Sequence, residues 1–244
     1  MTKIYDALRR AEQEQSPVPG LEGGPQPPMG IEARSHGLRQ KLIAVYQTIE
    51  SHLPGKASRV VMFVGARAGE GTSTLVRELA KLASAELAQH VALIDFTAGI
   101  GGHYEHFGVV PAAGLHDVVA GRATLENALQ PVREDSMLSL GCVATGESSA
   151  SVVVANPKFS ETMQALRQRF TLILLDVPPL SDSSDALLAA PETDGVVMIV
   201  EAETTRWQVA ENVREKVAIQ GGNVLGVILN KRQFYIPSFI YRRL

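Results

Sequence analysis

The segment that decides the fold is residues 59–80, RVVMFVGARAGEGTSTLVRELA. It begins with an apolar, β-branched run that predicts a buried strand, continues through a glycine-rich loop and ends in a helical pattern. Gly65, Gly69 and Gly71 permit the tight backbone path of such a loop. A plain strand-to-helix turn would use the same glycines, but strand, loop and helix occur here in the order that a phosphate-binding loop requires. We refer to residues 65–71 as the glycine loop.

The glycine loop lacks the lysine that phosphate-binding loops normally carry for the β- and γ-phosphates. Thr72 stands in its place, and no neighbouring lysine replaces it in the sequence. The amides of Ser73 and Thr74 open the helix and would point at a phosphate chain, while the Ser73 hydroxyl would ligate Mg²⁺. Losing one preorganised donor typically costs roughly 3 kcal/mol of transition-state stabilisation. The sequence therefore predicts that nucleotide binding is kept and that turnover is weakened.

The rest of the chain alternates short β-branched runs with helical patterns. Continuous apolar strands between helices are typical of an α/β fold in three layers, a mostly parallel sheet with helices on both faces, as in P-loop NTPases. The predicted strands are residues 60–64, 90–95, 137–142, 172–176, 195–200 and 224–229. The predicted helices include residues 73–89, 157–169 and 206–220.

Two predicted strands end in an aspartate. Asp95 closes VALID and Asp176 closes TLILLD. Either residue alone could cap a helix, but the carboxyl ends of parallel strands form the ligand-binding edge of such sheets, and Mg²⁺ prefers hard oxygen ligands. Together with the glycine loop, the aspartates indicate a metal–nucleotide site with Ser73, Asp95 and Asp176 as the metal ligands.

Composition and charge limit the function classes. The chain has 244 residues, 45% of them hydrophobic and 20% charged, with a formal net charge of -3. This predicts one folded domain with an extension, and it excludes a polybasic protein that binds nucleic acid through charge alone. The single cysteine, Cys142, excludes an internal disulfide and favours a cytoplasmic protein. No apolar run approaches the ~20 residues of a membrane-spanning helix, so any membrane association would be peripheral.

Three regions follow from the composition along the chain. Residues 1–15 predict an amphipathic helix, which either docks on a partner or is an idle tail. Residues 16–30, SPVPGLEGGPQPPMG, hold nine Pro or Gly among fifteen and predict a linker. Residues 31–244 form the predicted nucleotide-binding domain. Its end, KRQFYIPSFIYRRL, interleaves bases with aromatics, which suits either a membrane surface or ordinary packing on the sheet.

The chain resembles the cytoplasmic domain of bacterial tyrosine kinases (BY-kinases) of capsule and exopolysaccharide synthesis, which belong to the MinD/ParA class of P-loop ATPases. The segments similar to that family are MTKIYDALRRAE at the start and residues 106–130, 155–205 and 223–244. The resemblance implies a MinD/ParA-like fold, Asp95 as the acid of the second Walker motif, Asp176 as the Walker B acid and Asn230 as an adenine contact. It also implies Gly69, Gly71, Ser73 and Thr74 as phosphate and Mg²⁺ contacts. With the remaining residues at the loop, the predicted nucleotide-binding residues are Arg67, Gly69, Glu70, Gly71, Thr72, Ser73, Thr74 and Asn230.

The chain departs from the family pattern at four places. Besides Thr72, residues 96–99, FTAG, replace the further aspartate and the basic residue of the second Walker motif. Arg67 falls where the MinD/ParA class carries an additional signature lysine, and it would partly restore positive charge. Many family members end in a tyrosine cluster that is phosphorylated in trans, whereas only Tyr235 and Tyr241 lie in this tail. These departures put phosphoryl transfer in doubt.

The resemblance leads to a first hypothesis, a cytoplasmic ATP-binding, tyrosine-autokinase-like protein at the inner face of the membrane. It would bind ATP or ADP with Mg²⁺, form homo-oligomers, and regulate exopolysaccharide polymerisation and export with an inner-membrane copolymerase. If activity is retained, Asp95 would be the base toward a tyrosine hydroxyl. A catalytically dead pseudokinase scaffold and a ParA/MinD-type positioning ATPase are the alternatives. Nucleic acid is not expected as a partner.

Two minor signals are also open to two interpretations. His103 and His106, three residues apart, could share one face of a helical turn and bind a metal, or serve a structural role. Trp207 at the start of a predicted helix indicates packing if buried and a partner surface if exposed.

Overall fold

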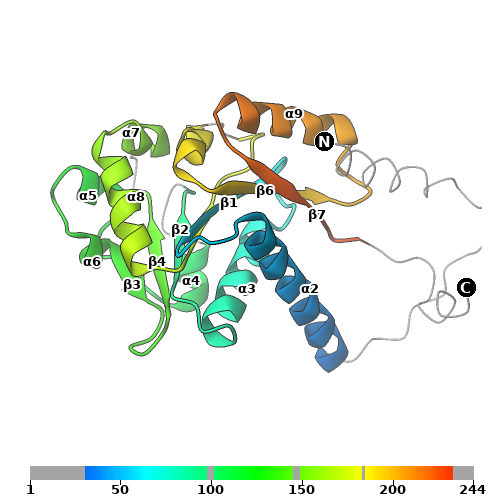
Figure 1. The fold of residues 1–244 in the computed structure, drawn as a ribbon, viewed down its shortest axis with the longest axis horizontal. Helices are drawn as coiled ribbons and strands as arrows, with labels where there is room; N and C mark the ends of the chain where they lie inside the picture. The colour runs from blue at the N-terminus through cyan, green and yellow to red at the C-terminus, as the bar shows by residue number, and fades with distance from the viewer. Residues whose placement is uncertain (1–30, 98–101, 145–148, 183–184, 233–244) are drawn as a thin grey trace, which may run out of the picture.

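The computed structural model describes residues 31–97, 102–144, 149–182 and 185–232. They form one seven-stranded sheet with the strand order β3-β4-β2-β5-β1-β6-β7 (Figure 1). Every neighbouring pair is parallel except β3 and β4. The strands are β1 (Arg59–Gly65), β2 (Val91–Asp95), β3 (Leu129–Pro131), β4 (Leu138–Cys142), β5 (Leu172–Asp176), β6 (Gly195–Glu201) and β7 (Val224–Asn230).

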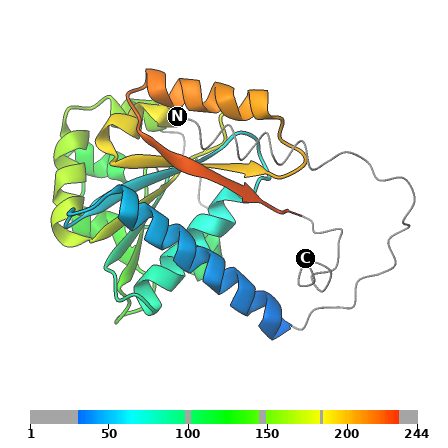
Figure 2. The ribbon, with the colours of Figure 1, turned by 45° about the vertical axis from the view of Figure 1, so that its right-hand side comes forward.

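Helices cover both faces of the sheet, as predicted (Figures 1 and 2). One face packs against α2 (Ile31–His52), α3 (Thr72–Ala85) and α4 (His103–Phe107). The opposite face packs against α5 (Leu115–Val119), α6 (Leu125–Ala128), α7 (Ala150–Val154), α8 (Lys158–Arg169), the 3₁₀ helix η1 (Asp185–Glu192) and α9 (Trp207–Ile219).

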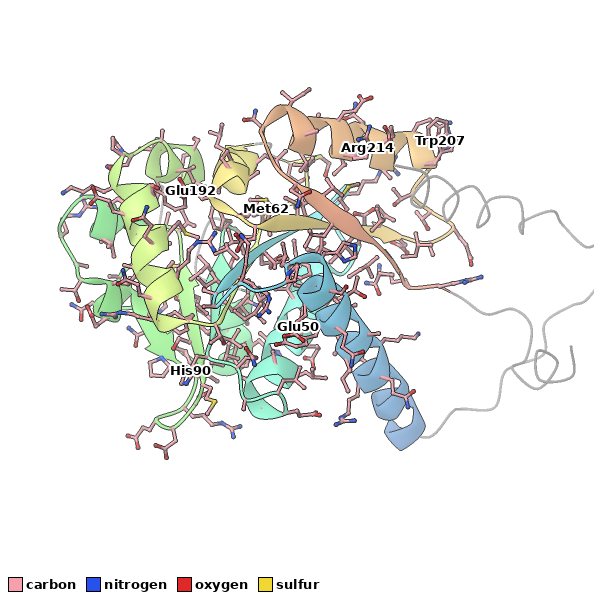
Figure 3. The ribbon with its side chains drawn as sticks, viewed as in Figure 1. Glu50, Met62, His90, Glu192, Trp207 and Arg214 are labelled. Atoms are coloured by element: carbon pink, nitrogen blue, oxygen red, sulfur yellow. The ribbon has the colours of Figure 1, made fainter. Side chains whose placement is uncertain are left out.

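The strands are buried because each supplies apolar side chains to both faces. Along β1, Val60, Met62 and Val64 belong to the core under η1 and α9, whereas Val61 and Phe63 belong to the core under α2 and α3. Figure 3 shows Met62 in the middle of this sheet. Burying apolar side chains on both faces stabilises the sheet by roughly 25 cal/mol for each Å² removed from water. Only the ends and edges of the strands therefore remain for a ligand.

All six predicted strands are present, with ends that differ from the predictions by one residue or less for most. The predicted helix 73–89 ends earlier, at Ala85, because Ala88 adopts a left-handed conformation with φ 51°. The antiparallel edge strand β3 and the long helix α2 were not predicted. Nothing in the described part of the chain is a helix long and apolar enough to span a membrane. The predicted regions 1–30 and 233–244 lie outside the described residues.

A charged cluster joins elements at the amino end of the strands. The Asp194 side chain is 5% exposed and accepts hydrogen bonds from the Val60 amide at 2.7 Å and from Arg167 Nη1 at 2.7 Å, and it also pairs with Lys56. Burial alone would raise the pKa of the Asp194 carboxyl, but the hydrogen bonds from Arg167 and Lys56 hold it below its usual value. The ionised carboxylate thus ties β1, α8 and the start of β6 together, at the end of the sheet opposite the glycine loop.

Candidate functional site

The glycine loop and both predicted aspartates lie at the same end of the sheet. β1 ends at Gly65, directly before the loop, while β2 ends at Asp95 and β5 at Asp176. The two aspartates are register partners on neighbouring parallel strands, and Phe63 of β1 is the register partner of Asp176 on its other side. The topology therefore brings two carboxylates next to the turn that begins α3.

The glycine loop delivers the chain to an open helix terminus. Gly69 and Gly71 have φ values of 85° and 87°, which glycine adopts without strain. Gly71 is the N-cap of α3, with no side-chain cap, and the first turn of the helix holds no acidic residue. The first amides of a helix have no partner within it. The amides at Thr72, Ser73 and Thr74 therefore present the partly positive end of α3 to a ligand.

The buried Glu70 side chain stabilises the glycine loop through hydrogen bonds to its backbone amides. Its carboxylate is 2% exposed and accepts hydrogen bonds from the amides of Ala66 at 2.6 Å and Arg67 at 2.9 Å. The other carboxylate oxygen accepts from the Thr205 hydroxyl at 2.6 Å and from the amide of Glu201, at the end of β6, at 3.4 Å. These contacts place Glu70 behind the loop, as a brace between the loop and β6.

Asn230 lies against the loop at the end of β7. Its side-chain amide donates to the Glu70 carbonyl at 2.7 Å. A Cβ added to Gly71 would come within 2.5 Å of Asn230 Nδ2, so this close approach needs a glycine. The structure thus places Asn230 at the loop, and its predicted adenine contact stays a prediction.

Thr72 brings no positive charge to the loop. The Thr72 hydroxyl lies 2.8 Å from the position that a Cβ on Gly65 would take, so its side chain turns back toward the base of the loop. Arg67 is exposed. The positive end of α3 and the exposed Arg67 are therefore the positive groups that the loop can offer to an anion.

Asp95 is buried beside a second carboxylate. Its Oδ1 accepts from the backbone amide of Thr97 at 2.8 Å and from the Thr97 hydroxyl at 2.5 Å. Burial raises the pKa of Asp95, and the neighbouring Asp176 acts in the same direction, while the Thr97 hydrogen bonds oppose both. A carboxylate with a raised pKa is a stronger proton acceptor than an ordinary aspartate.

Asp176 is held by a histidine that the residue pattern did not assign to it. His103 Nε2 lies 2.8 Å from Asp176 Oδ2, and both side chains are 1% exposed. Asp176 Oδ1 and His103 Nδ1 are buried without a hydrogen-bond partner in the described structure. His106, three residues on, is exposed and lies 2.8 Å from Lys81 Nζ instead. The two histidines therefore do not share a metal site. His103 instead makes a structural contact, which was the other interpretation of these histidines.

The donor set fits a magnesium ion at one carboxylate oxygen. No group of three or more His, Cys, Asp or Glu side chains within the described ranges could hold a metal ion by itself. Mg²⁺ in nucleotide sites needs fewer protein ligands, because one or two side chains hold it together with phosphates and waters. Asp176 Oδ1 is the buried acceptor left open for it, together with the half-buried Ser73. Asp95 Oδ1 is already occupied by Thr97.

Trp207 belongs to the first turn of α9, from which it projects in Figure 3, and it is half-buried. This degree of burial does not decide between packing and a partner surface as the role of Trp207.

The contacts of Thr205 with Glu70 and of Thr97 with Asp95 were not predicted, since hydroxyl side chains in loops carry no periodic signal.

A family model described as "Cellulose biosynthesis protein BcsQ" matches residues 58–215, which include the glycine loop and both aspartates. The chain belongs to this family. Among relatives of this BcsQ-family chain, tyrosine-protein kinase CpsD of Streptococcus agalactiae is 28% identical over 182 residues, which cover 72% of the chain and 77% of CpsD. Putative tyrosine-protein kinase EpsB of Ralstonia nicotianae is 26% identical over 196 residues, 78% of the chain but 25% of EpsB. These relatives confirm the predicted resemblance to BY-kinases.

Solved structures confirm the predicted fold class of this BcsQ-family protein. The VpsO kinase domain superposes with a TM-score of 0.69 at 26% identity, covering 84% of this chain and 100% of that domain. The septum site-determining protein MinD of Pyrococcus horikoshii, solved with Mg-ADP, has a TM-score of 0.55 at 22% identity, covering 76% of each chain. The MinD likeness shows the fold alone, a P-loop NTPase sheet with its helices.

Proposed function

We propose that this protein binds ATP or ADP and serves a capsule or exopolysaccharide system as a BY-kinase-like regulator. The observation that carries the proposal is the preformed glycine loop, whose uncapped helix terminus lies at the same end of the sheet as two buried carboxylates. Backbone amides at a helix N-terminus bind phosphate without any lysine. The relatives named as tyrosine-protein kinases support the same function.

In this proposal, different groups of the chain bind the phosphates, the base or ribose, and the Mg²⁺ ion. The amides from Gly69 to Thr74 would hold the phosphate chain, and Asn230 would meet the base or ribose beside the loop. Ser73 and Asp176 would hold Mg²⁺, which when bound neutralises phosphate charge. Asp95, with its raised pKa, would accept the proton of a hydroxyl nucleophile.

The same geometry supports weak turnover or none. With Thr72 in place of the lysine, the helix start offers no lysine ammonium to the charge that develops during phosphoryl transfer. The loss of one such donor corresponds to about a hundredfold or more in rate. Thr97, which occupies one oxygen of Asp95, favours the second candidate, a pseudokinase that binds nucleotide and acts as a scaffold. A positioning ATPase of the ParA type is the third candidate, and the kinase names of the relatives speak against it.

The partner in this proposal is an inner-membrane polysaccharide copolymerase, and the protein would work as a homo-oligomer in the cytoplasm at the membrane face. Two relatives support the assignment: one is named "Succinoglycan biosynthesis transport protein ExoP" from Rhizobium meliloti, and a solved neighbour is described as the chimerical protein CapA2B2. Co-purification with an inner-membrane polysaccharide copolymerase of the same organism, followed by light scattering, would test both partner and assembly.

Radiolabelled ATP with purified full-length protein tests the proposed function. Wild type is compared with Thr72→Lys, which restores the loop lysine, and with Asp176→Ala. We expect wild type to bind nucleotide and to transfer little or no label, and Thr72→Lys to bind more tightly. Phosphotyrosine on wild type would eliminate the scaffold candidate, whereas absence of nucleotide binding by wild type would refute the proposed site itself.

A further inference from the structure

The outer edge of the sheet at β7 is long, apolar and unpaired within the described ranges (Figures 1 and 2). All seven residues of β7, VLGVILN, are half-buried, whereas every residue of β2 and β5 is buried. The other edge strand, β3, has three residues and ends in Pro131. Short strands and prolines keep further strands from pairing with an edge, and β7 has neither of these protections.

Gly226 in β7 has empty space on one face of the sheet. Apart from its chain neighbours, no heavy atom of the described residues lies within 4 Å of the position that a Cβ on Gly226 would take. Side chains two residues apart in a strand share a face, and Ile228 packs against the core under α2 and α3. The unpaired edge therefore adjoins an unfilled space on that face.

We propose that residues 234–240 pair antiparallel with β7 as an eighth strand, which closes this edge. These seven residues, FYIPSFI, equal β7 in length, and five of them are aromatic or β-branched, the types that favour strands. They follow β7 after a short connection that includes Lys231, whose φ of 56° has the sign that hairpin turns use. Lys231 also pairs with Glu201 at 3.2 Å, which holds that connection at the end of β6.

This segment is favoured over a second copy of the chain because it is attached to β7. A segment tethered by a few residues has an effective concentration of about millimolar, so it pairs before another molecule does. Its Pro237 also suits an outermost strand, because proline occurs in edge strands where the missing N–H faces solvent. The eighth strand would then protect this edge of the sheet as Pro131 protects the edge at β3.

The direction of the β7 backbone and the position of the proline lead to the same register. The Asn230 carbonyl accepts from the Ala202 amide at 2.9 Å, so this residue faces β6. Because the backbone groups of successive residues point to opposite sides of a strand, those of Val227 face outward. Pro237 must face away from β7, since it has no N–H to donate. Pairing Val227 with Ile236 satisfies both conditions.

This register also fills the empty space on the sheet. It leaves residues 230–233 as a turn of four residues, a common length for hairpins. Pro237 would lie opposite Gly226, with Tyr235 and Phe239 diagonally across from it on the same face. Aromatic side chains beside an edge glycine cover the surface that the glycine leaves open.

The pairing would withhold a tail tyrosine from phosphoryl transfer. Tyr235 belongs to the proposed strand, and a strand held against β7 cannot extend into the active site of another copy. Phosphorylation of Tyr235 would therefore require the strand to detach. The pairing itself needs no nucleotide, so it goes beyond the proposed function and can fail or hold independently of it.

Hydrogen exchange of the full-length protein, followed residue by residue by NMR, tests the pairing. In an outermost strand only every second residue bonds to its neighbour, so we expect the amides of Ile236 and Ser238 to exchange slowly. Those of Tyr235 and Phe239 should exchange about tenfold or more faster. The outward amide of Val227 should be protected as well. Docking of the tail as a helix would protect consecutive amides and would give no such alternation.

Two proline variants form a matched pair. Ile236→Pro and Tyr235→Pro each remove one large side chain, but only the Ile236 amide faces β7 in the proposed register. We expect Ile236→Pro to speed the exchange of the Val227 amide by about tenfold or more, and Tyr235→Pro to leave it unchanged. The buried amides of β5 report in the same experiment whether each variant is folded.

The outcomes separate the tail from other occupants of the edge. Alternating protection in wild type, with loss of Val227 protection in Ile236→Pro alone, supports the eighth strand. Uniform protection of the tail, exchange of the whole tail at the rate of an unstructured chain, or equal loss in both variants overturns it. A protected Val227 amide beside an unprotected tail, with a dimer in light scattering, also overturns it and assigns the edge to a second copy. All these measurements are made without nucleotide, so none of them bears on the nucleotide site.

Discussion

Replacing Glu70 should destabilise the whole domain, because its buried carboxylate satisfies donors from three segments. In Glu70→Ala, the amide of Ala66 and the hydroxyl of Thr205 lose their acceptor inside the protein. The amide of Arg67 belongs to an exposed residue, so water can replace its partner. Each buried donor left unpaired costs about 1–3 kcal/mol. We therefore expect the free energy of unfolding to fall by about 3 kcal/mol.

Glu70→Gln provides the matched comparison. The glutamine carbonyl can still accept from the two loop amides, and its NH₂ group faces a Thr205 hydroxyl that can rotate to accept. Only the long contact from the Glu201 amide, at 3.4 Å, and the charge are lost. The expected destabilisation of about 1 kcal/mol is consequently much smaller than that of Glu70→Ala.

Urea unfolding followed by circular dichroism measures both changes, and a thermal scan gives shifts of about 2–4 °C for each kcal/mol. Glu215→Ala, an exposed glutamate on α9, serves as the control and should stay within about 0.5 kcal/mol of wild type. Two results would refute the brace: a Glu70→Ala protein as stable as this control, or a Glu70→Gln protein as unstable as Glu70→Ala.

Four further substitutions have expected outcomes in urea unfolding. Gly71→Ala should lower the free energy of unfolding by about 1–3 kcal/mol, because the φ of Gly71 is positive and Asn230 Nδ2 occupies the space that a Cβ would need. Gly37→Ala should raise the free energy of unfolding by about 0.5–1 kcal/mol, because Gly37 lies in α2 with open space around its Cβ position. Asp194→Asn should lose about 2 kcal/mol at neutral pH, and its difference from wild type should vanish as the pH falls through the lowered pKa of Asp194. Asp95→Asn should be more stable than wild type at neutral pH, because burial raises the pKa of Asp95 and the ionised carboxylate therefore destabilises the fold. This gain in stability should shrink as the pH falls toward about 4, where the carboxylate becomes protonated. A gain that stays constant with pH would contradict the prediction.

Periodicity predicted the sheet well because its strands are buried on both faces. Residues 172–175 and 195–200 contain only apolar residues or glycine, which suit a strand buried on both faces, and Asp176, the last residue of the first of these strands, marks the ligand edge. The helix α2 was not predicted, although Leu42, Tyr46 and Ile49 are buried along one face of it and Leu53 is buried directly after its end. Their spacing of four, three and four residues was the available signal.

The candidate site could be located from the sequence but not resolved in detail. Spacing predicted that Asp95 and Asp176 lie near the glycine loop, because parallel strands end at one edge. It could not predict that His103 bonds Asp176 or that Thr205 bonds Glu70, since these contacts join residues 73 and 135 positions apart. Such pairings are decided by tertiary packing, and a single sequence holds no record of them.

The Glu70 brace also bears on selectivity among ligands. Because the carboxylate, Thr205 and Asn230 fix the loop before anything binds, the conformational entropy of ordering the loop is lost during folding. If the protein binds nucleotide as proposed, a phosphate chain would meet a loop that is already ordered and that contacts every phosphate chain in the same way. Discrimination between one nucleotide and another would then have to come from groups that contact the base and the ribose.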